Sequence, residues 1–469
     1  MKTELFLLTI AFLGLAACNP STKKDNKQNP VVTFDSLAVT PPMGWNSWDC
    51  LGLDANEDQV KSVVDYMALH LKQYGWEYVV IDAGWYHPKE LITANWQIKN
   101  PSQNIDKYGR LIPDTLKYPS AKNGVGFKAV ADYIHSKGLK FGIHVMRGIP
   151  WNAVANNAPI KGTNYYAHDV ANFKDTCSWS KTMKGVNMEK PGAQEYYNSV
   201  YEMYAEWGVD FVKVDDISNP YHRSEIEGVH QAILNSKSAI VLSLSPGPAP
   251  VTEWAHLEKN AHMWRISGDF WDNWKWLKRQ FGICSQWDSV HTPGHWPDAD
   301  MLPIGKLRKT GGDAWTASQL GSTIAEVTDE YSRFTDTEKY TLMTLWSIFK
   351  SPLMIGGYLP ENDSVTYKII TNEEVIAVDQ QSENNHEVRN QNGMVIWTAD
   401  LPGSKSKYVA VFNTNDGKAE PISVTWSEIG VSGELKVRDL WAKKDLGNFS
   451  EKISLSVEPH GCRLIKIGQ

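Results

Sequence analysis

The feature that most constrains the fold of this chain is an alternation between amphipathic helical stretches and short, almost wholly apolar runs. Five such runs are "YVVIDAGW" (78–85), "LKFGIHV" (139–145), "VDFVKVDD" (209–216), "AIVLSLSPG" (239–247) and "HMWRISGD" (262–269). The first follows the helical pattern of residues 58–75, and the second follows that of residues 127–138. Strands that are apolar on both faces are typical of a parallel sheet covered by helices, so we expect an α/β fold.

The number of these units favours a closed barrel over an open, doubly wound sheet. Roughly eight strand–helix units fit between residues 39 and 387, as a (β/α)8 TIM barrel requires. No glycine-rich dinucleotide fingerprint follows any of the runs in the sequence, which argues against the open alternative. The sequence therefore predicts a TIM barrel over residues 39–387.

The last part of the chain has a different pattern. The runs "MVIWTADL", "KYVAVFNT" and "LKVRDLWA" alternate apolar and polar residues and are separated by turn signals, with no convincing helix between them. This pattern predicts an antiparallel β-sandwich over residues 388–469. We expect it to pack against the barrel, and a sugar-binding role is the alternative.

The N-terminus is typical of an exported lipoprotein. Residues 1–18 combine Lys2, an apolar run too short to span a bilayer and a "LAAC" sequence that ends at Cys18 and resembles the bacterial lipobox. Residues 19–38 are mostly polar and suit a tether. We expect a lipid anchor at Cys18 that holds the protein on a membrane, in the periplasm or at the cell surface; cleavage nearby with an incidental Cys18 is the alternative.

Composition indicates what kind of partner to expect. The net charge of −7 gives no support to nucleic-acid binding, which needs a basic face. The 20 Trp residues favour a carbohydrate partner, because indole rings stack on the apolar faces of sugars, although large aromatics also fill large cores. Cys50, Cys177, Cys284 and Cys462 match no metal-ligand spacing, and the sequence leaves their disulfide pairing open.

Carboxylates follow the ends of several predicted strands. Asp82, Asp215 and Asp269 come at or just after the apolar runs, and Asp298 and Asp300 lie in the stretch "WPDADML". A single aspartate at such a place is an ordinary helix cap. Several together indicate a site, because the loops after the strands of a TIM barrel build its active site.

Two carboxylates that face each other across a pocket are what glycoside hydrolysis requires, one as nucleophile and the other as acid and then base. Lys213 and Asp215 are two residues apart and share one side of their strand. A nearby ammonium would keep Asp215 ionised, as a nucleophile must be. Asp216 points to the other side, where we expect a helix cap or a supporting acceptor.

Arg265 and Asp269 enter the same region and supply the second carboxylate. An acid must be protonated before it can donate, and a desolvated pocket of Trp residues would raise the pKa of Asp269. Asp272 is the rival for this role, and the spacing alone does not decide between the two.

The order of several motifs resembles glycoside hydrolase family 27, which contains α-galactosidases, α-N-acetylgalactosaminidases and relatives acting on β-L-arabinopyranosides and isomaltosyl units. The motifs are "PPMGWNSW" (41–48), "VVIDAGW", "FVKVDD", "RISGDFWDNW", "WPDADML" and "EVIAVDQ" (374–380). The resemblance covers almost the whole barrel and implies a retaining exo-glycosidase with α-D-galactosides as the default substrate. It also implies a covalent glycosyl-enzyme, a C-terminal β-sandwich and no cofactor or metal.

Carried over by position, the resemblance implies that Asp215 is the nucleophile and Asp269 the acid/base, which removes the rivalry with Asp272. The positions that contact the sugar in the family fall on Trp48, Asp82, Lys213 and Arg265. Ser245 stands where many members read the substituent at C2 of the sugar. The family's acidic pair falls on Asp298 and Asp300, which we expect to support the site from behind.

Two departures from the family pattern bear on the sugar. Typical α-galactosidases have two aspartates after the second strand, which hold the 4- and 6-hydroxyls of galactose, whereas this chain reads Asp82-Ala83. The lost acceptor would cost about 1–3 kcal/mol for a buried hydroxyl. At the end of the fifth strand, where many members read "SCEW" or "SCSW", Ser245 lies between Leu244 and Pro246.

Three alternatives to an α-galactosidase follow. A β-L-arabinopyranosidase or another glycosidase of the family is one, because arabinopyranose is galactose without its C6 arm. A non-catalytic glycan-binding surface lipoprotein is another, although it would be expected to lack Asp215 or Asp269. A metal-dependent barrel lyase would need converging His and carboxylate ligands, and we interpret His144 and His295 as hydrogen-bonding wall residues instead.

Overall fold

The computed structural model describes residues 33–91, 102–311, 317–318, 323 and 325–468. The predicted signal segment, Cys18 and most of the predicted tether lie outside the described residues. Within the described ranges, no helix combines the length and the apolar character that crossing a membrane requires.

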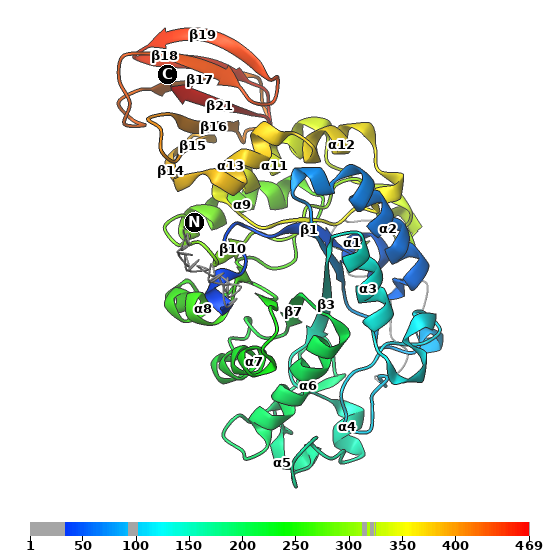
Figure 1. Ribbon diagram of the computed structural model, residues 1–469. Coiled ribbons are helices and arrows are strands. Elements are labelled where there is room, and N and C mark those ends of the chain that lie inside the picture. Colours follow the sequence, from blue (N-terminus) through cyan, green and yellow to red (C-terminus); the bar gives the residue numbers. More distant parts are fainter. Residues whose placement is uncertain (1–32, 92–101, 312–316, 319–322, 324, 469) are drawn as a thin grey trace, which may run out of the picture. The chain divides into compact units, whose positions relative to one another are not determined.

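The larger part of the fold is built on a sheet of eight parallel strands (Figure 1). In spatial order these are β10 (Trp296–Asp298), β9 (Met263–Arg265), β8 (Val241–Leu244), β7 (Phe211–Asp215), β3 (Lys140–Met146), β2 (Tyr78–Ile81), β1 (Met43–Asn46) and β13 (Leu353–Ile355). A parallel bridge joins Leu302, just after β10, to Ile355 of β13 at the opposite edge. The sheet is therefore curled and joined at its edges, which confirms the predicted TIM barrel.

Helices between and after the strands cover the outside of the barrel (Figure 1). They are α2 (Glu57–His70), α3 (Lys128–Ser136), α6 (Ala193–Trp207), α7 (Arg223–Ser236), α8 (Trp254–Asn260), α9 (Trp274–Trp287), α11 (Asp336–Phe349), α12 (Ser364–Ile370) and α13 (Glu373–Gln381). The short helix α1 (Trp48–Leu51) instead follows directly after β1, at the carboxyl end of that strand. Local sequence sets where several begin: Asn56 and Gln59 form a reciprocal capping box on α2, and Thr335 and Glu338 form one on α11.

The interior of the barrel is packed at the end where the strands begin. Tyr78, Phe211, Val241, Met263 and Trp296, each the first residue of its strand, belong to one buried apolar cluster. This packing closes one end of the barrel, so polar side chains at the opposite, carboxyl end of the strands are free to line a site.

A long connection between β3 and α6 forms a separate small layer. It contains β4 (Ile149–Pro150), α4 (Trp151–Ala155), α5 (Ala167–Val170), β5 (Ala171–Asn172) and β6 (Met183–Val186), with the strands paired in the order β4-β6-β5. The strand pairing gives this segment a defined backbone, and part of it reaches the site described below.

The C-terminal part is the predicted antiparallel β-sandwich. One sheet has the order β14 (Glu383–Gln391), β15 (Met394–Asp400), β16 (Lys407–Asn413), β21 (Cys462–Gly468), β18 (Glu434–Asp439) and β19 (Lys444–Ser450). The second pairs β17 (Glu420–Thr425) with β20 (Lys452–Val457), and both sheets contribute to one apolar core. β14 begins five residues before the predicted boundary at 388. The sequence does not indicate this earlier start, because the polar residues "ENNHE" carry no strand pattern.

The barrel and the sandwich are joined by contacts of α11. The hydroxyl of Thr341 donates a hydrogen bond to the carbonyl oxygen of His460, and the indole of Trp441 donates one to the hydroxyl of Thr344. The four cysteines in the described ranges are free thiols.

Candidate active site

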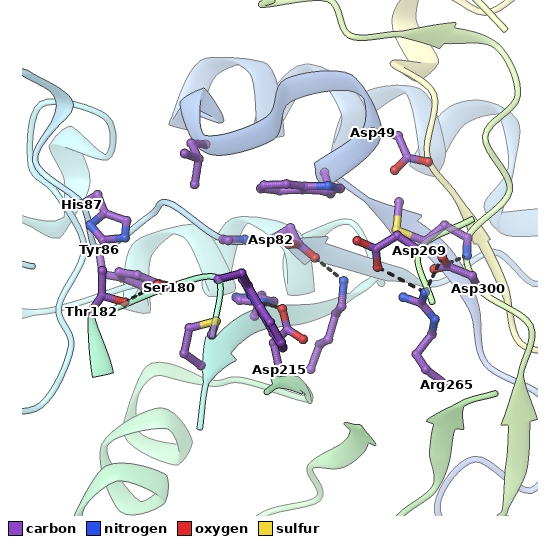
Figure 2. A pocket seen from close by; sticks show the side chains of 18 of the residues that line it. Asp49, Asp82, Tyr86, His87, Ser180, Thr182, Asp215, Arg265, Asp269 and Asp300 are labelled. Atoms are coloured by element: carbon purple, nitrogen blue, oxygen red, sulfur yellow. Dashed lines mark hydrogen bonds and ion pairs between the residues drawn. The ribbon is translucent and has the colours of Figure 1, made fainter. Parts of the chain in front are cut away.

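A cavity of about 720 Å³ lies at the carboxyl ends of the barrel strands (Figure 2). The described residues that line it are Trp48, Asp49, Leu53, Asp82, Ala83, Tyr86, His87, His144, Met146, Trp179, Ser180, Lys181, Thr182, Lys213, Asp215, Arg265, Asp269, Phe270, Trp271, Asp300 and Met301. Of the residues predicted to act in catalysis or to contact the sugar, Ser245 is the one that is not in this wall. His295, also predicted as a wall residue, is absent from it too. The structure thus brings both predicted catalytic aspartates to one cavity.

Asp215 is the last residue of β7 and is held by three donors. Its Oδ1 accepts hydrogen bonds from the Ser245 hydroxyl at 3.1 Å and from the Asp216 amide at 3.0 Å, and its Oδ2 lies 3.3 Å from Nε2 of His144. Burial works against the charged form, but the contact with His144 and the charge of Lys213 outweigh it and lower the pKa of Asp215. Asp215 is therefore an ionised carboxylate at neutral pH, as a nucleophile must be.

Ser245 lies behind Asp215 rather than in the cavity wall, where the family resemblance would place a residue that reads the substituent at C2 of the sugar. It is buried, with 1% of its surface exposed, and its hydroxyl points to Asp215 and to the carbonyl oxygen of Val214. Its substrate-binding role stays a prediction, whereas its contact with the nucleophile candidate is direct. The sequence analysis does not predict the contact of His144 with Asp215. The feature that indicates it is the parallel pairing of β3 with β7, which places His144 beside Lys213.

Asp82 is the anchor of the polar wall on the β2 side. Its Oδ2 accepts hydrogen bonds from Asn46 at 2.7 Å and from the Lys213 ammonium at 2.9 Å, and its Oδ1 accepts one from the amide of Ala83. Burial works against the charged form, but the charges of Lys213 and His144 and the hydrogen bonds from Lys213 and Ala83 hold the pKa of Asp82 far below its usual range. The direct partner of Lys213 is thus Asp82, and Lys213 acts on Asp215 through its charge alone.

Asp269 lies at the rim, in the loop between β9 and α9. Its Oδ1 is 3.3 Å from Nη2 of Arg265, and its side chain is 52% exposed. The prediction of a desolvated Trp pocket around Asp269 is therefore wrong: Phe270 and Trp271 are buried beside Asp269 but do not cover it. A bound sugar and its leaving group would remove water from Asp269 in their place.

Asp300 holds the loop of Asp269 from behind. Its Oδ2 forms an ion pair with Arg265 at 2.6 Å and accepts a hydrogen bond from the Phe270 amide at 2.7 Å. Burial, with the negative charges of Asp269 and Asp298, raises the pKa of Asp300 to about 7. The amide of Asp300 in turn donates to Asp298 Oδ1, so the acidic pair supports the site as expected.

Asp272, the rival of Asp269, lies outside the cavity wall. Its carboxylate is fully buried and pairs with Arg308 at 3.0 Å, and it accepts a hydrogen bond from the Arg333 amide. A carboxylate held in this way has no access to a sugar, so the geometry favours Asp269. His295 is also buried away from the cavity wall, with Nδ1 2.8 Å from the carbonyl oxygen of Ala261.

Sequence reasoning missed several further wall residues that are buried and polar, among them Asp49, Tyr86 and His87. Burial lowers the pKa of His87 to about 4 and raises that of the Tyr86 phenol, so both are neutral at pH 7. Burial and the charge of Asp300 raise the pKa of Asp49, which favours its neutral form. Tyr86 and His87 follow directly after "IDAGW", and that adjacency was the only signal for them.

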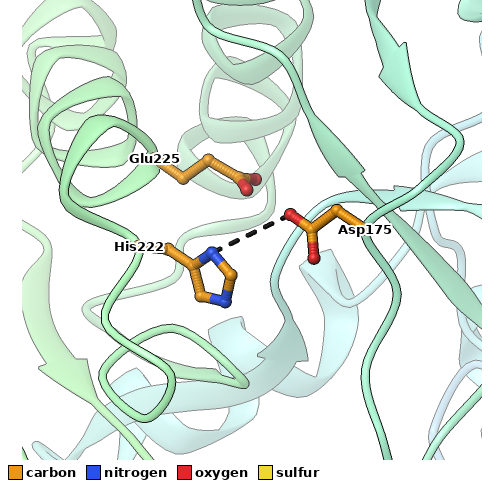
Figure 3. Close-up of side chains that lie close together, drawn as sticks. All are labelled: Asp175, His222 and Glu225. Carbon is orange, nitrogen blue, oxygen red and sulfur yellow. Dashed lines mark ion pairs between the residues drawn. The ribbon is translucent and has the colours of Figure 1, made fainter.

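One group of side chains beside the cavity has a spacing that could suit a cation. Asp175, His222 and Glu225 each place one donor atom within 4.8 Å of the others (Figure 3). The guanidinium of Arg147, however, pairs with Asp175 at 2.8 Å and with Glu225 at 2.6 Å. The positive charge that these carboxylates require is therefore already supplied by a side chain, and the group is an ion-pair cluster.

Two carboxylates on a polar, sugar-sized cavity at the carboxyl ends of a TIM barrel define a glycoside hydrolase. The pattern described as "Alpha galactosidase A" matches residues 40–186 and 180–326, and that of the "Alpha galactosidase C-terminal beta sandwich domain" matches residues 391–467. The chain belongs to glycoside hydrolase family 27, the α-galactosidase family.

The relatives include enzymes of two specificities, β-L-arabinopyranosidases and α-galactosidases. A β-L-arabinopyranosidase of family 27 from Geobacillus stearothermophilus is 45% identical and superposes with a TM-score of 0.87 over 93% of this chain and 98% of its own. A variant of that enzyme in complex with arabinose is 44% identical, with a TM-score of 0.88 over 93% of this chain and 99% of its own. The α-galactosidase of Cyamopsis tetragonoloba is 30% identical over 92% of this chain and 86% of its own.

Proposed function

We propose that this glycoside hydrolase removes single terminal sugars of galactose-like configuration with retention at the anomeric carbon, and that β-L-arabinopyranosides are its preferred substrates. The observation that carries the preference is Ala83, which stands in the cavity wall beside Asp82 where typical members of the family have a second carboxylate. α-D-Galactosides are the second candidate, supported by the α-galactosidases among the relatives.

The preference follows from what each sugar needs in the cavity. β-L-Arabinopyranose has the ring configuration of α-D-galactopyranose but lacks the hydroxymethyl arm at C6. The 4- and 6-hydroxyls of galactose ask for two acceptors, and Asp82 is the one carboxylate on this part of the wall. A hydroxyl left without its acceptor costs about 1–3 kcal/mol, which galactose incurs and arabinopyranose avoids. The 45% identity to a β-L-arabinopyranosidase supports the same choice.

The first half of the reaction uses both catalytic aspartates. Asp215, kept ionised by His144 and Lys213, attacks the anomeric carbon from the face opposite the leaving group. Asp269 transfers its proton to the glycosidic oxygen as the bond between that oxygen and the anomeric carbon breaks. The products are a glycosyl ester on Asp215 and the free alcohol of the leaving group.

The second half reverses the roles at the same anomeric carbon. Asp269, now a carboxylate, takes a proton from water while the water oxygen attacks the anomeric carbon and the ester bond to Asp215 breaks. Two inversions give net retention. Arg265 lies 2.6 Å from Asp300, so it keeps a carboxyl partner whether Asp269 is protonated or not.

A panel of aryl glycosides tests the proposal directly. We expect kcat/KM to be highest for the aryl β-L-arabinopyranoside, lower for the α-D-galactopyranoside, and lowest for the α-N-acetylgalactosaminide and the α-glucoside. A higher kcat/KM for the galactoside than for the arabinoside would overturn the preference and leave an α-galactosidase. Inactivity on the whole panel would favour a non-catalytic glycan-binding protein.

The substitution Ala83→Asp is expected to move the preference toward galactose. The new carboxylate would supply the second acceptor, and about 1–3 kcal/mol corresponds to a rise of roughly 5- to 150-fold in the galactoside-to-arabinoside ratio of kcat/KM. Ala83→Asn, of the same shape without the charge, is the matched control and should move the ratio less. An unchanged ratio in Ala83→Asp would show that Ala83 does not determine specificity.

We further propose that the protein is exported and held on a membrane by lipid at Cys18, in the periplasm or at the cell surface. In bacterial cells the wild type is expected in the membrane fraction, with lipid on an N-terminal cysteine detectable by mass spectrometry. Cys18→Ser is expected to lose the lipid and leave the membrane fraction. Wild-type protein that carries no lipid would contradict the proposal.

A further inference from the structure

We propose that the segment Trp179–Thr182 forms a binding site for the leaving group, so that the substrate is the terminal sugar of an oligo- or polysaccharide whose next sugar stacks on Trp179. The inference rests on the proposed function and extends it from the sugar removed to the sugar that stays behind. Trp179, Ser180, Lys181 and Thr182 all belong to the cavity wall.

The exposure of the wall residues separates an inner site from a rim. Asp82, His144 and Arg265 are buried, and Lys213 and Asp215 are nearly so, which suits them to a sugar that is fully enclosed. Among the described wall residues, Asp269, Trp179 and Lys181 are the exposed ones. Asp269 must reach the oxygen that joins the removed sugar to the leaving group. The leaving group therefore lies toward the solvent-exposed side of the cavity, where Trp179 and Lys181 are the other exposed wall residues.

The side chains of this rim match the chemistry of a sugar. Trp179 is 53% exposed, and a large aromatic exposed at the mouth of a cavity offers an apolar face for the C–H side of a pyranose ring. The residues that follow Trp179 in the wall are Ser180, Lys181 and Thr182. They bring an ammonium and two hydroxyls, Ser180 Oγ and Thr182 Oγ1, which are 2.8 Å apart (Figure 2). These groups can exchange hydrogen bonds with sugar hydroxyls.

The rim is tied to the strand that carries the nucleophile through Arg147. Its amide donates to the carbonyl oxygen of Asp215 at 2.8 Å, and its guanidinium donates to the Asp216 carboxylate at 2.9 Å. The same guanidinium pairs at 2.8 and 3.0 Å with both oxygens of Asp175, four residues before Trp179. Arg147 is therefore a positioning residue that fixes the rim relative to Asp215.

Backbone pairing fixes the rest of the segment. The amide of Trp151 donates to the carbonyl oxygen of Thr182 at 2.8 Å, and the hydroxyl of Thr176 donates to that of Met183 at 2.9 Å. A site whose backbone is already ordered loses less entropy on binding than a loose loop does. The segment is thus a preformed wall for a ligand.

The test compares substrates that differ only in the leaving group. Glycosyl fluorides of β-L-arabinopyranose and α-D-galactose release fluoride, which is too small to reach Trp179, whereas disaccharides with the same terminal sugars release a sugar. In Trp179→Ala we expect the disaccharide-to-fluoride ratio of kcat/KM to fall by about tenfold or more, mainly through KM. Trp179→Phe, which keeps an aromatic face, should retain most of the ratio.

Transfer to an added sugar gives a second readout from the same site. A free sugar that occupies the rim competes with water for the glycosyl-enzyme, so Trp179→Ala should lower the ratio of transfer to hydrolysis. Trp254→Ala is the matched control, since Trp254 of α8 is 45% exposed but lies outside the cavity wall. It should leave both ratios unchanged.

The outcomes separate this inference from the proposed function. Equal losses on fluoride and disaccharide in Trp179→Ala would show a structural role for Trp179 and overturn the inference, and so would no loss on either. A wild type inactive on both fluorides would instead overturn the proposed function, because a fluoride needs only the inner site and Asp215.

Discussion

Asp215→Asn is expected to lower kcat for every glycoside that the enzyme cleaves by roughly 10⁴-fold or more, the scale of loss when a group that acts on the reacting atoms is removed. An amide is a far weaker nucleophile than a carboxylate and cannot form the glycosyl ester. The loss should be independent of the leaving group, because the bond to Asp215 forms in the first step whatever departs.

The fold should survive this substitution. An asparagine oxygen can still accept hydrogen bonds from Ser245 and the Asp216 amide, so thermal unfolding of Asp215→Asn should stay close to that of the wild type. Asp215→Gly gives the positive test: azide in its place should restore turnover of an activated substrate. The glycosyl azide should have the inverted configuration, because azide attacks from the face of Asp215. Retention of more than about one hundredth of the wild-type kcat in Asp215→Asn would exclude it as nucleophile.

Much of the barrel could be predicted because its information is local. A run such as "YVVIDAGW" is apolar on both faces and follows an amphipathic helical stretch. These two patterns together suffice to predict a parallel strand that helices cover. The carboxyl ends of such strands meet at one end of the barrel, so Asp82, Asp215 and Asp269 could be assigned to one site without knowing any distance.

The parts that could not be predicted depend on side chains meeting across the fold. Lys213 was expected beside Asp215 because the two share one side of β7, but the ammonium also faces the neighbouring strands, and Asp82 offers it the closer carboxylate at 2.9 Å. The exposure of Asp269 depends on a loop whose path no periodicity encodes. Arg147, Asp175 and Glu225 lie far apart in the chain, and their spacing carries no pattern.

The family resemblance assigned roles to residues that local sequence patterns could not assign, and the structure agrees with some of these assignments more closely than with others. The choice of Asp269 over Asp272 came from position in the family motif, and the buried pair of Asp272 with Arg308 agrees with it. The place of Ser245, by contrast, is behind the nucleophile, although its alignment suggests a contact with the sugar. The role of Ser245 at the sugar stays a prediction, because its neighbours Leu244 and Pro246 differ from the family pattern.

Asp269→Ala is expected to give losses that depend on the leaving group, in contrast to Asp215→Asn. A sugar leaving group needs the proton of Asp269, so hydrolysis of disaccharides should fall by about 10²- to 10⁴-fold, the usual contribution of a general acid. A fluoride departs without a proton, so the first step with a glycosyl fluoride should stay fast. The second step still needs a base to activate water, and the glycosyl-enzyme on Asp215 should therefore accumulate and appear as a burst of fluoride.

Azide distinguishes the two aspartates by stereochemistry. In Asp269→Ala, azide needs no base and would attack the glycosyl-enzyme from the side that the leaving group vacated, so the glycosyl azide should keep the configuration of the substrate. In Asp215→Gly the product should be inverted. Asp269→Asn is the matched control: it keeps a polar partner for Arg265, 3.3 Å away in the wild type, and should show the same pattern. If losses in Asp269→Ala were equal for fluoride and disaccharide, Asp269 could not be the acid. In that case Asp300, whose pKa is raised to about 7, would be the carboxyl nearest to Arg265 that could still hold a proton.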